Sequence, residues 1–300
     1  MGTAEFAVPS LRTLVKSGYD ICTVATAPDK PRGRGQKLLP TPVKSLALEL
    51  HLSLLQPVSP GDPEFFRLLQ NIGPDLIVVV AFRILPREIF TLAPRGSLNL
   101  HASLLPRYRG AAPIQRALMA GERETGVTTF FLAESVDTGS ILLQARMAIH
   151  EEDDAGTLHD RLADLGADVV LKTVRLIEEG KAIAKPQDSS LASSAPKIFK
   201  DDCLIRWNRP ALEIRNQIRA LSPSPGAFTT HADKLIKLYR ASVVPGEREP
   251  GTIEVRGNTL TIGTGDGLLS VELIQHEGRK MMGVGEFLRG YPVRTGDRFN

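Results

Sequence analysis

The amino-acid sequence predicts an α/β chain, with a doubly wound, mostly parallel sheet followed by a small β-barrel domain. Continuous apolar runs alternate with amphipathic helical stretches through the first half, which is typical of strands covered by helices on both faces. A Ser-, Ala- and Pro-rich segment then interrupts the alternation, and short strand-like runs with closely spaced glycine turns follow it. We therefore expect a catalytic domain over residues 1–184, a linker over 185–203 and a barrel over 204–300.

Hydrophobic periodicity defines the elements of the first half. Buried strands are expected where β-branched and apolar residues run together, at 21–26, 75–82, 97–104 and 126–132. Helices are expected over 6–17, 42–51, 62–72, 113–120 and 157–179. A doubly wound domain usually opens with a strand, but no apolar run precedes Gly2. We therefore hypothesise that the translated start lies upstream and that a first strand precedes Met1, which the intact mass of the natural protein would test.

The second half changes from helix to strand signals. One helix is expected over 211–220, and strands over 226–230, 235–242, 252–255, 259–262 and 268–274. The sequences Arg256-Gly-Asn and Gly265-Asp-Gly supply tight turns between them. These short, evenly spaced strands predict the small barrel.

Composition narrows the functional classes. The chain has 42% hydrophobic and 24% charged residues, an ordinary balance for a globular protein. Its two cysteines lie far apart without a metal-binding pattern, and no signal peptide precedes the first helix, so we expect a cytoplasmic protein. The longest apolar run, residues 76–82, is far shorter than the roughly 20 residues that span a bilayer. No oligomer is required, and we expect a monomer.

The net charge of +3 is unevenly placed. Residues 200–300 contain 15 Lys and Arg against 12 Asp and Glu, which accounts for the whole surplus. A second basic concentration lies at residues 29–44, where Lys30, Arg32, Arg34, Lys37 and Lys44 stand against one acid, Asp29. Both features suit a polyanionic partner. A solvated loop and a mildly basic surface would give the same pattern, so charge alone leaves both interpretations open.

The densest group of candidate catalytic residues begins at Asn99-Leu-His101. Side chains alternate along a strand, so Asn99 and His101 share one face, and they stand where the strand ends. Ligands bind at this carboxyl end in open α/β sheets. An amide could stabilise an oxyanion while the imidazole moves a proton, which fits acyl transfer. Both residues could equally serve only local backbone groups.

Asp137 lies in Ser-Val-Asp-Thr-Gly, between two strand-like runs. An aspartate there is most often a turn residue. A catalytic role would require its carboxylate to orient the His101 ring, and the sequence alone does not bring the two together. The chain contains no Gly-rich nucleotide-binding motif, no Gly-x-Ser-x-Gly and no metal-binding His cluster. We therefore expect neither a metal nor a nucleophilic serine or cysteine.

These segments resemble the folate-dependent formyltransferases. Asn99-Leu-His-Ala-Ser-Leu-Leu-Pro-Arg-Tyr-Arg-Gly-Ala-Ala-Pro is similar to the signature of that family, and Val136-Asp-Thr-Gly is similar to its second motif. The resemblance implies a Rossmann-like formyltransferase domain, an OB-like barrel, and a catalytic set of Asn99, His101 and Asp137. It also implies 10-formyltetrahydrofolate as formyl donor, contacted by Phe82, Leu85, Ser103, Leu104, Leu105 and Pro106. The family usually has Ala-Tyr-Gly where this chain has Ala81-Phe-Arg83, so the backbone conformation at Arg83 is in question.

Other segments resemble the branch of the family that acts on initiator methionyl-tRNA. They are the opening Gly2-Thr-x-Glu-Phe, the basic loop after Pro28 and the ending Gly296-Asp-Arg-Phe. This resemblance implies that Arg32, Arg34 and Lys37 bind the tRNA acceptor stem. The alternatives are a formyltransferase for a nucleotide-sugar amine, which shares the catalytic domain, and an RNA-binding protein on an inactive scaffold. The basic loop from Arg32 to Lys37 discriminates against the first alternative. The intact set of Asn99, His101 and Asp137 opposes the second.

Overall fold

A computed structural model describes residues 1–32 and 37–300 of the chain. The chain forms two compact units. The first unit contains Met1–Ala111, Glu124–Ala148 and His159–Ala195, and the second contains Ala112–Arg123, Ile149–Leu158 and Pro196–Asn300. The expected α/β unit and the expected β-rich unit are both present, which confirms the predicted fold class.

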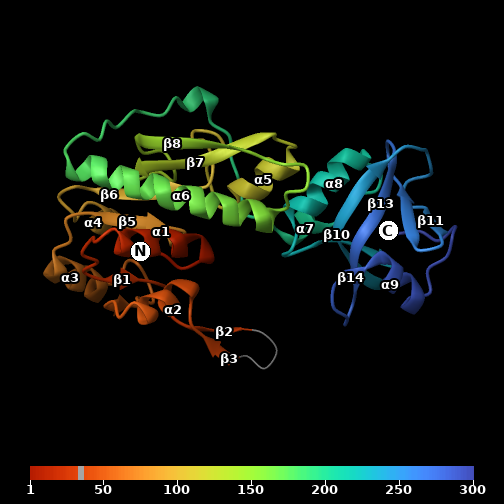
Figure 1. The fold of residues 1–300 in the computed structure, drawn as a ribbon, viewed down its shortest axis with the longest axis horizontal. Coiled ribbons are helices and arrows are strands. Elements are labelled where there is room, and N and C mark those ends of the chain that lie inside the picture. Colours follow the sequence, from red (N-terminus) through yellow and green to blue (C-terminus); the bar gives the residue numbers. More distant parts are fainter. Residues whose placement is uncertain (33–36) are drawn as a thin grey trace. The chain divides into compact units, whose positions relative to one another are not determined.

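The first unit is built on an open sheet (Figure 1). Strands β5 (Ile77–Val80) and β6 (Ser97–His101) are parallel, and β7 (Glu124–Phe131) and β8 (Ile141–Ala148) continue the sheet antiparallel in the order β5-β6-β7-β8. A second parallel pair joins β1 (Val24–Ala25) to β4 (Leu54–Leu55). Gly2 links the pairs, because it bridges Val80 in parallel and its N–H donates to the Ala25 carbonyl.

Several helices belong wholly or largely to this unit. They are η1 (Glu5–Ala7), α1 (Val8–Lys16), α2 (Pro42–Glu49), α3 (Pro63–Ile72), α4 (Arg87–Phe90), η2 (Ser189–Leu191) and the long α6 (Ala155–Glu178). Local chemistry sets their ends. The Asp62 carboxylate accepts from the Glu64 N–H at the start of α3, and Gly73 ends that helix in the left-handed conformation that glycine adopts without strain.

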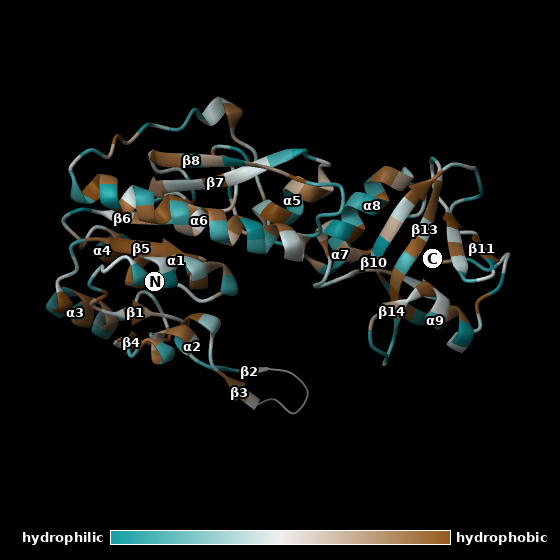
Figure 2. Cartoon of the chain, in the orientation of Figure 1, coloured by the Kyte–Doolittle hydropathy of each residue, from teal (hydrophilic) through white to brown (hydrophobic). Residues whose placement is uncertain are grey.

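A buried apolar cluster fixes α3 and α4 against the sheet. Phe65 and Leu69 of α3 and Ile89 of α4 pack with Ile77 and Val79 of β5, and all five are at most 4% exposed. Figure 2 shows β5 as a hydrophobic strand, as its uninterrupted apolar sequence predicts. This packing fixes β5, and parallel pairing with β5 positions β6, which carries candidate residues of the site.

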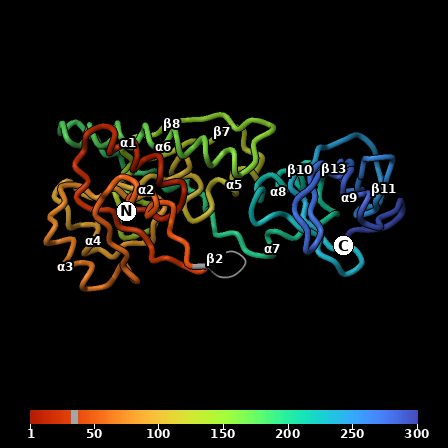
Figure 3. Tube along the Cα trace, turned by 60° about the horizontal axis from the view of Figure 1, so that its bottom comes forward, coloured from red at the N-terminus to blue at the C-terminus, as the bar shows by residue number. Residues whose placement is uncertain are grey.

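A short hairpin extends from the first unit (Figures 1 and 3). It consists of β2 (Lys30–Arg32) and β3 (Lys37–Leu39), which pair antiparallel with Arg32 opposite Lys37. The Lys44 ammonium lies 2.7 Å from Asp29 Oδ2, and Gln56 Nε2 donates to Asp29 Oδ1 at 3.0 Å. The hydrogen bonds from Lys44 and Gln56 hold the pKa of the Asp29 carboxyl below its ordinary value. The base of the hairpin is therefore anchored to α2 and to the loop after β4.

The second unit contains an antiparallel sheet and several short helices. Its strands are β9 (Ala227–His231), β10 (Lys234–Val244), β11 (Ile253–Arg256), β12 (Thr259–Gly263), β13 (Leu268–His276) and β14 (Met282–Gly283). Its helices are α5 (Pro113–Met119), α7 (Lys200–Cys203), α8 (Ala211–Ala220) and α9 (Val284–Gly290). The order β11-β12-β13-β10-β9 is that of an open sheet, with β14 beside β13. Its core includes Ile214, Ile236, Ile262, Ile274 and Phe287.

Candidate active site

Strand β6 places Asn99 and His101 on one face, as the alternation of a strand requires. Asn99 is in register with Val79 of β5 and Phe130 of β7, and His101 is in register with Thr128. His101 is buried, whereas Asn99 is partly exposed. No group within the described part of the chain hydrogen-bonds the Asn99 amide. That amide can therefore donate to a bound substrate without first breaking an internal bond.

The segment after β6 folds back against β7 and β8. Thr128 Oγ1 donates to the Ser103 carbonyl at 2.7 Å and accepts from the Leu105 N–H at 3.1 Å. Gln144 Nε2 donates to the Leu105 carbonyl at 2.8 Å and to Thr128 Oγ1 at 3.0 Å. Because these bonds fix backbone groups, the path of residues 103–105 is defined by side chains on two neighbouring strands.

Asp137 lies beside His101, although the sequence could not bring them together. Its Oδ2 is 3.6 Å from His101 Nδ1 and accepts from the Gly110 N–H at 2.8 Å. Both side chains are 8% exposed. The Asp137 backbone has φ +55°, in the left-handed region that aspartate tolerates better than most residues. A tight turn thus directs a buried carboxylate at the imidazole.

The other ring nitrogen of His101 also faces an oxygen. Nε2 lies 2.8 Å from the Tyr108 carbonyl, which can only accept, so Nε2 carries a proton in this arrangement. Nδ1 faces the Asp137 carboxylate. A ring with a proton on each nitrogen satisfies both acceptors, whereas a neutral ring satisfies one. Nδ1 is therefore the ring nitrogen that faces the carboxylate, and Nε2 is the one that the backbone holds.

Residues from the segment expected to be a linker support this geometry. Gln187 Nε2 donates to the carbonyls of Asp137 at 2.9 Å and Gly139 at 2.8 Å. Gln187 Oε1 accepts from Arg109 Nε at 3.0 Å and Nη2 at 2.7 Å. Ser193 Oγ accepts from the Tyr108 N–H at 2.9 Å. Sequence reasoning missed these positioning residues, because nothing in a Ser- and Pro-rich stretch indicates which polar side chain returns to the site.

The expected folate-contacting residues lie in two segments of the first unit. Ser103 and Leu105 are buried and Leu104 and Pro106 are partly exposed, and Ser103 Oγ donates to the Arg107 carbonyl at 2.6 Å. After β5, Phe82 is partly exposed and Leu85 is buried. The two segments follow neighbouring parallel strands, which is where a ligand of an open α/β sheet is expected.

Arg83 does not require a left-handed backbone. Positive φ in this loop occurs at Ala81, at +47°, and Arg83 lies outside that region. Its guanidinium instead donates to the carbonyls of Val58 and Pro57, and it lies 5.5 Å from the centre of the Phe82 ring. Arg83 therefore ties the loop after β5 to residues 57 and 58.

We expect Arg83→Ala to lower the free energy of unfolding by about 1–3 kcal/mol, because two carbonyls lose a charged donor. Urea denaturation measures this change. Arg83→Lys should recover only part of the loss, since one ammonium does not reproduce the planar fork. Equal stability of the wild type and Arg83→Ala would show that the hydrogen bonds from Arg83 do not contribute to the free energy of unfolding.

The structure describes two of the three basic residues that are expected to bind tRNA. Arg32 and Lys37 belong to the paired ends of β2 and β3, whereas Arg34 lies outside the described residues. Lys44, which contributed to the basic pattern, is held by Asp29. Of the three expected residues, the structure therefore places the backbone of Arg32 and Lys37, which face each other across the two strands.

Residues 1–32 and 37–300 contain no cluster of three or more His, Cys, Asp or Glu side chains with the geometry to hold a metal ion. None of their helices is both long and apolar enough to cross a membrane.

Sequence families match both halves of the chain. The formyl transferase family model matches residues 1–174, and the model for the formyl transferase C-terminal domain matches residues 197–292. Together with the Asn99–His101–Asp137 geometry, these matches define a transferase of one-carbon groups. The chain belongs to the formyl transferase family.

Individual proteins show the same similarity. The chain is 47% identical over 301 residues to a methionyl-tRNA formyltransferase of Pelotomaculum thermopropionicum, covering 99% of this chain and 96% of the relative. It is 48% identical over 301 residues to one of Moorella thermoacetica, with 99% and 97% covered. An N-formyltransferase of Helicobacter canadensis, solved with folinic acid and dTDP-3-aminofucose, matches with a TM-score of 0.66 at 22% identity, covering 90% of this chain and 96% of that one. At that identity, the solved structure supports the fold.

Proposed function

We propose that this enzyme transfers the formyl group of 10-formyltetrahydrofolate to the free amino group of methionine esterified to initiator tRNA. The observation that carries the proposal is nearly full-length identity of 47–48% to methionyl-tRNA formyltransferases, in a chain whose Asn99, His101 and Asp137 lie together. The proposed reaction belongs to translation initiation and takes place in the cytoplasm.

In the proposed mechanism, the neutral amine of the methionyl group attacks the formyl carbon. A carbon–nitrogen bond forms, and the carbonyl electrons move to oxygen. The Asn99 amide donates to this oxyanion, and fixed donors of this kind contribute roughly 10²–10³-fold in rate. His101, oriented by Asp137, takes the proton that the amine loses and supplies one to the departing folate nitrogen. Cleavage of the bond to that nitrogen restores the carbonyl and releases tetrahydrofolate.

The basic hairpin is proposed to recognise the nucleic acid. Arg32, Arg34 and Lys37 would contact phosphates of the acceptor stem, which position the aminoacyl end without reading sequence. The pairing of β2 with β3 and the ion pair between Lys44 and Asp29 support this proposal, because they fix the base of the hairpin. The basic surplus of residues 200–300 would add further backbone contacts.

A direct assay separates this function from the sugar alternative. Purified enzyme and 10-formyltetrahydrofolate are incubated with charged initiator tRNA or with nucleotide-sugar amines, and formylated product is measured. We expect turnover with the charged tRNA and none with the sugars. Turnover of a nucleotide-sugar amine alone would replace the proposed substrate while leaving the formyl-transfer chemistry intact.

Neutralising the hairpin should weaken tRNA binding. In the triple variant Arg32→Gln, Arg34→Gln, Lys37→Gln, we expect the slope of log affinity against log salt to fall by about one for each lost phosphate contact. The turnover number at saturating tRNA should change little. The matched control is Lys16→Gln, Arg67→Gln, Lys172→Gln, which removes three exposed charges elsewhere. An unaltered slope in the hairpin variant would show that these residues do not contact phosphate.

A further inference from the structure

Residues 187–195 form a strap along the loop that follows β6. Ser194 forms a parallel bridge with Arg109. The Arg109 N–H donates to the Ser193 carbonyl at 2.9 Å, and the Ala195 N–H donates to the Arg109 carbonyl at 2.6 Å. Most of the strap is exposed to solvent, so hydrogen bonds account for most of its attachment to the loop.

The loop that the strap holds contacts both proposed acid–base residues. The Tyr108 carbonyl accepts from His101 Nε2 at 2.8 Å, and the Gly110 N–H donates to Asp137 Oδ2 at 2.8 Å. Two backbone groups of one short loop therefore bind the imidazole and the carboxylate at the same time. A shift of this loop would change the distance between His101 Nδ1 and Asp137 Oδ2, which is 3.6 Å.

One side chain of the strap joins this loop to the turn at Asp137. Gln187 Nε2 donates to the carbonyls of Asp137 at 2.9 Å and Gly139 at 2.8 Å. Gln187 Oε1 accepts from Arg109 Nε and Nη2. A side chain without both a donor and an acceptor could not make this set of bonds. The amide of Gln187 therefore fixes the backbone on two sides of the Asp137 carboxylate.

We propose that Gln187 is a positioning residue for formyl transfer, which holds the Asp137 carboxylate in place beside His101. The inference rests on the proposed catalytic roles of His101 and Asp137. Gln187 bonds to backbone carbonyls and to Arg109, so it acts on the reaction only through the groups that it holds. A displacement of about 1 Å at a reacting group can lower a rate by roughly 10²-fold, so fixing the backbone of Asp137 has a large effect.

Two substitutions at Gln187 separate its two sets of bonds. Gln187→Met keeps the length of the side chain and removes both the donor and the acceptor. Gln187→Glu keeps an acceptor for Arg109 but removes the donor to the carbonyls of Asp137 and Gly139. In single-turnover formylation, we expect the rate of the chemical step to fall by roughly 10–100-fold in both variants. The KM for the formyl donor should change by less than about 2-fold. A wild-type rate in either variant would overturn the proposal.

A double-mutant cycle with Asp137→Asn distinguishes positioning from a general structural effect. In the Asp137→Asn background, Gln187→Met should lower the rate by less than about 2-fold, because the charge that Gln187 positions is already gone. Two residues that contribute independently would instead give the same fold-loss in both backgrounds. Equal losses would therefore overturn the proposal.

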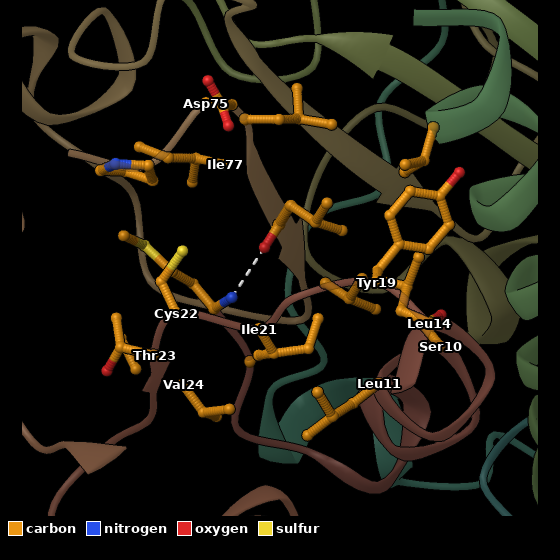
Figure 4. Close-up of a pocket in the computed structure, with 18 of the residues that line it drawn as sticks. Ser10, Leu11, Leu14, Tyr19, Ile21, Cys22, Thr23, Val24, Asp75 and Ile77 are labelled. Carbon is orange, nitrogen blue, oxygen red and sulfur yellow. Dashed lines mark hydrogen bonds between the residues drawn. The ribbon is translucent and has the colours of Figure 1, made fainter. Parts of the chain in front are cut away.

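Two control variants lie away from the catalytic residues. Gln70→Met removes an exposed amide of α3 and should leave the rate unchanged. Leu14→Ala truncates a buried leucine of α1 that lines an apolar groove of about 400 Å³, shown in Figure 4, and the proposed catalytic residues do not line this groove. It should lower the urea midpoint without changing the rate of the chemical step. A loss of rate in Leu14→Ala as large as that in Gln187→Met would overturn the proposal, since lost stability would then explain both.

The assay uses whichever acceptor the wild type formylates, whether charged tRNA or a nucleotide-sugar amine. A different substrate would therefore leave the comparison of variants intact. Loss of activity in His101→Ala together with a wild-type rate in Gln187→Met would overturn the role of Gln187 and leave the proposed function in place. Loss of the chemical step in both, with the non-additive result for Asp137→Asn, is the expected outcome.

Discussion

Replacement of His101 with alanine is expected to reduce formyl transfer by about 10²–10⁴-fold, the range typical for loss of a general acid–base group. The imidazole is buried, faces the Asp137 carboxylate at 3.6 Å and shares a strand face with the unpartnered Asn99 amide. Alanine removes the proton carrier and leaves the remaining binding surface in place. The expected loss is therefore in the rate of the chemical step, measured in single-turnover formylation assays, with tRNA affinity nearly unchanged.

His51→Asn is a matched control for this variant. His51 is an exposed histidine of the same unit, and asparagine tolerates its positive φ of +55°. We expect full activity from the control. Asp137→Asn should keep the bond from the Gly110 N–H but remove the charge beside Nδ1, and its loss should lie between those of the control and His101→Ala. Wild-type turnover in His101→Ala would refute the catalytic assignment.

Gly139→Ala is expected to damage stability and catalysis together. A Cβ atom at residue 139 would stand 1.7 Å from the Phe131 carbonyl oxygen, so the backbone has to move. Overpacking of this kind costs about 1–3 kcal/mol of stability. Gly139 lies two residues after Asp137, and Gln187 holds both carbonyls, so the carboxylate moves with it. A displacement of about 1 Å at a reacting group can lower the rate by roughly 10²-fold.

Urea denaturation and formylation kinetics measure the two effects separately. Gly290→Ala is the control, because a Cβ at residue 290 meets no atom within 4 Å and alanine favours the helix α9. We expect the control to match or exceed wild-type stability. Gly139→Ala with normal stability and normal turnover would show that the turn after Asp137 tolerates movement and does not set the geometry of the site.

Much of the fold follows from local patterns in the sequence. The apolar run at 75–82 became β5, the capped stretch after Asp62 became α3, and the glycine turns at 257 and 267 lie between the strands of the second unit. The helix α9 was not predicted. Its sequence, Val-Gly-Glu-Phe-Leu-Arg-Gly, is short and contains two glycines, and it is helical because Phe287 is buried in the core of the second unit.

The candidate site was predictable only in part, for geometric reasons. Asn99 and His101 share a strand, so their common face follows from strand periodicity. Asp137 is 36 positions further along and reaches His101 through a turn with positive φ, which no short-range pattern specifies. Gln187 is more distant still, in a segment whose composition indicated only a linker. The sequence therefore predicts which residues share a strand face. It does not predict contacts between remote segments, because these form only in the folded tertiary structure.

The anchoring of the hairpin at Asp29 has an evolutionary consequence. The ion pair with Lys44 and the bond from Gln56 fix the point where the chain leaves the sheet, and neither residue belongs to the four that connect β2 to β3. A change of length or charge in that connection is therefore not expected to disturb β6, the strand that carries both Asn99 and His101. If the hairpin has the proposed role, a change in the nucleic acid that it contacts therefore need not alter the residues of formyl transfer.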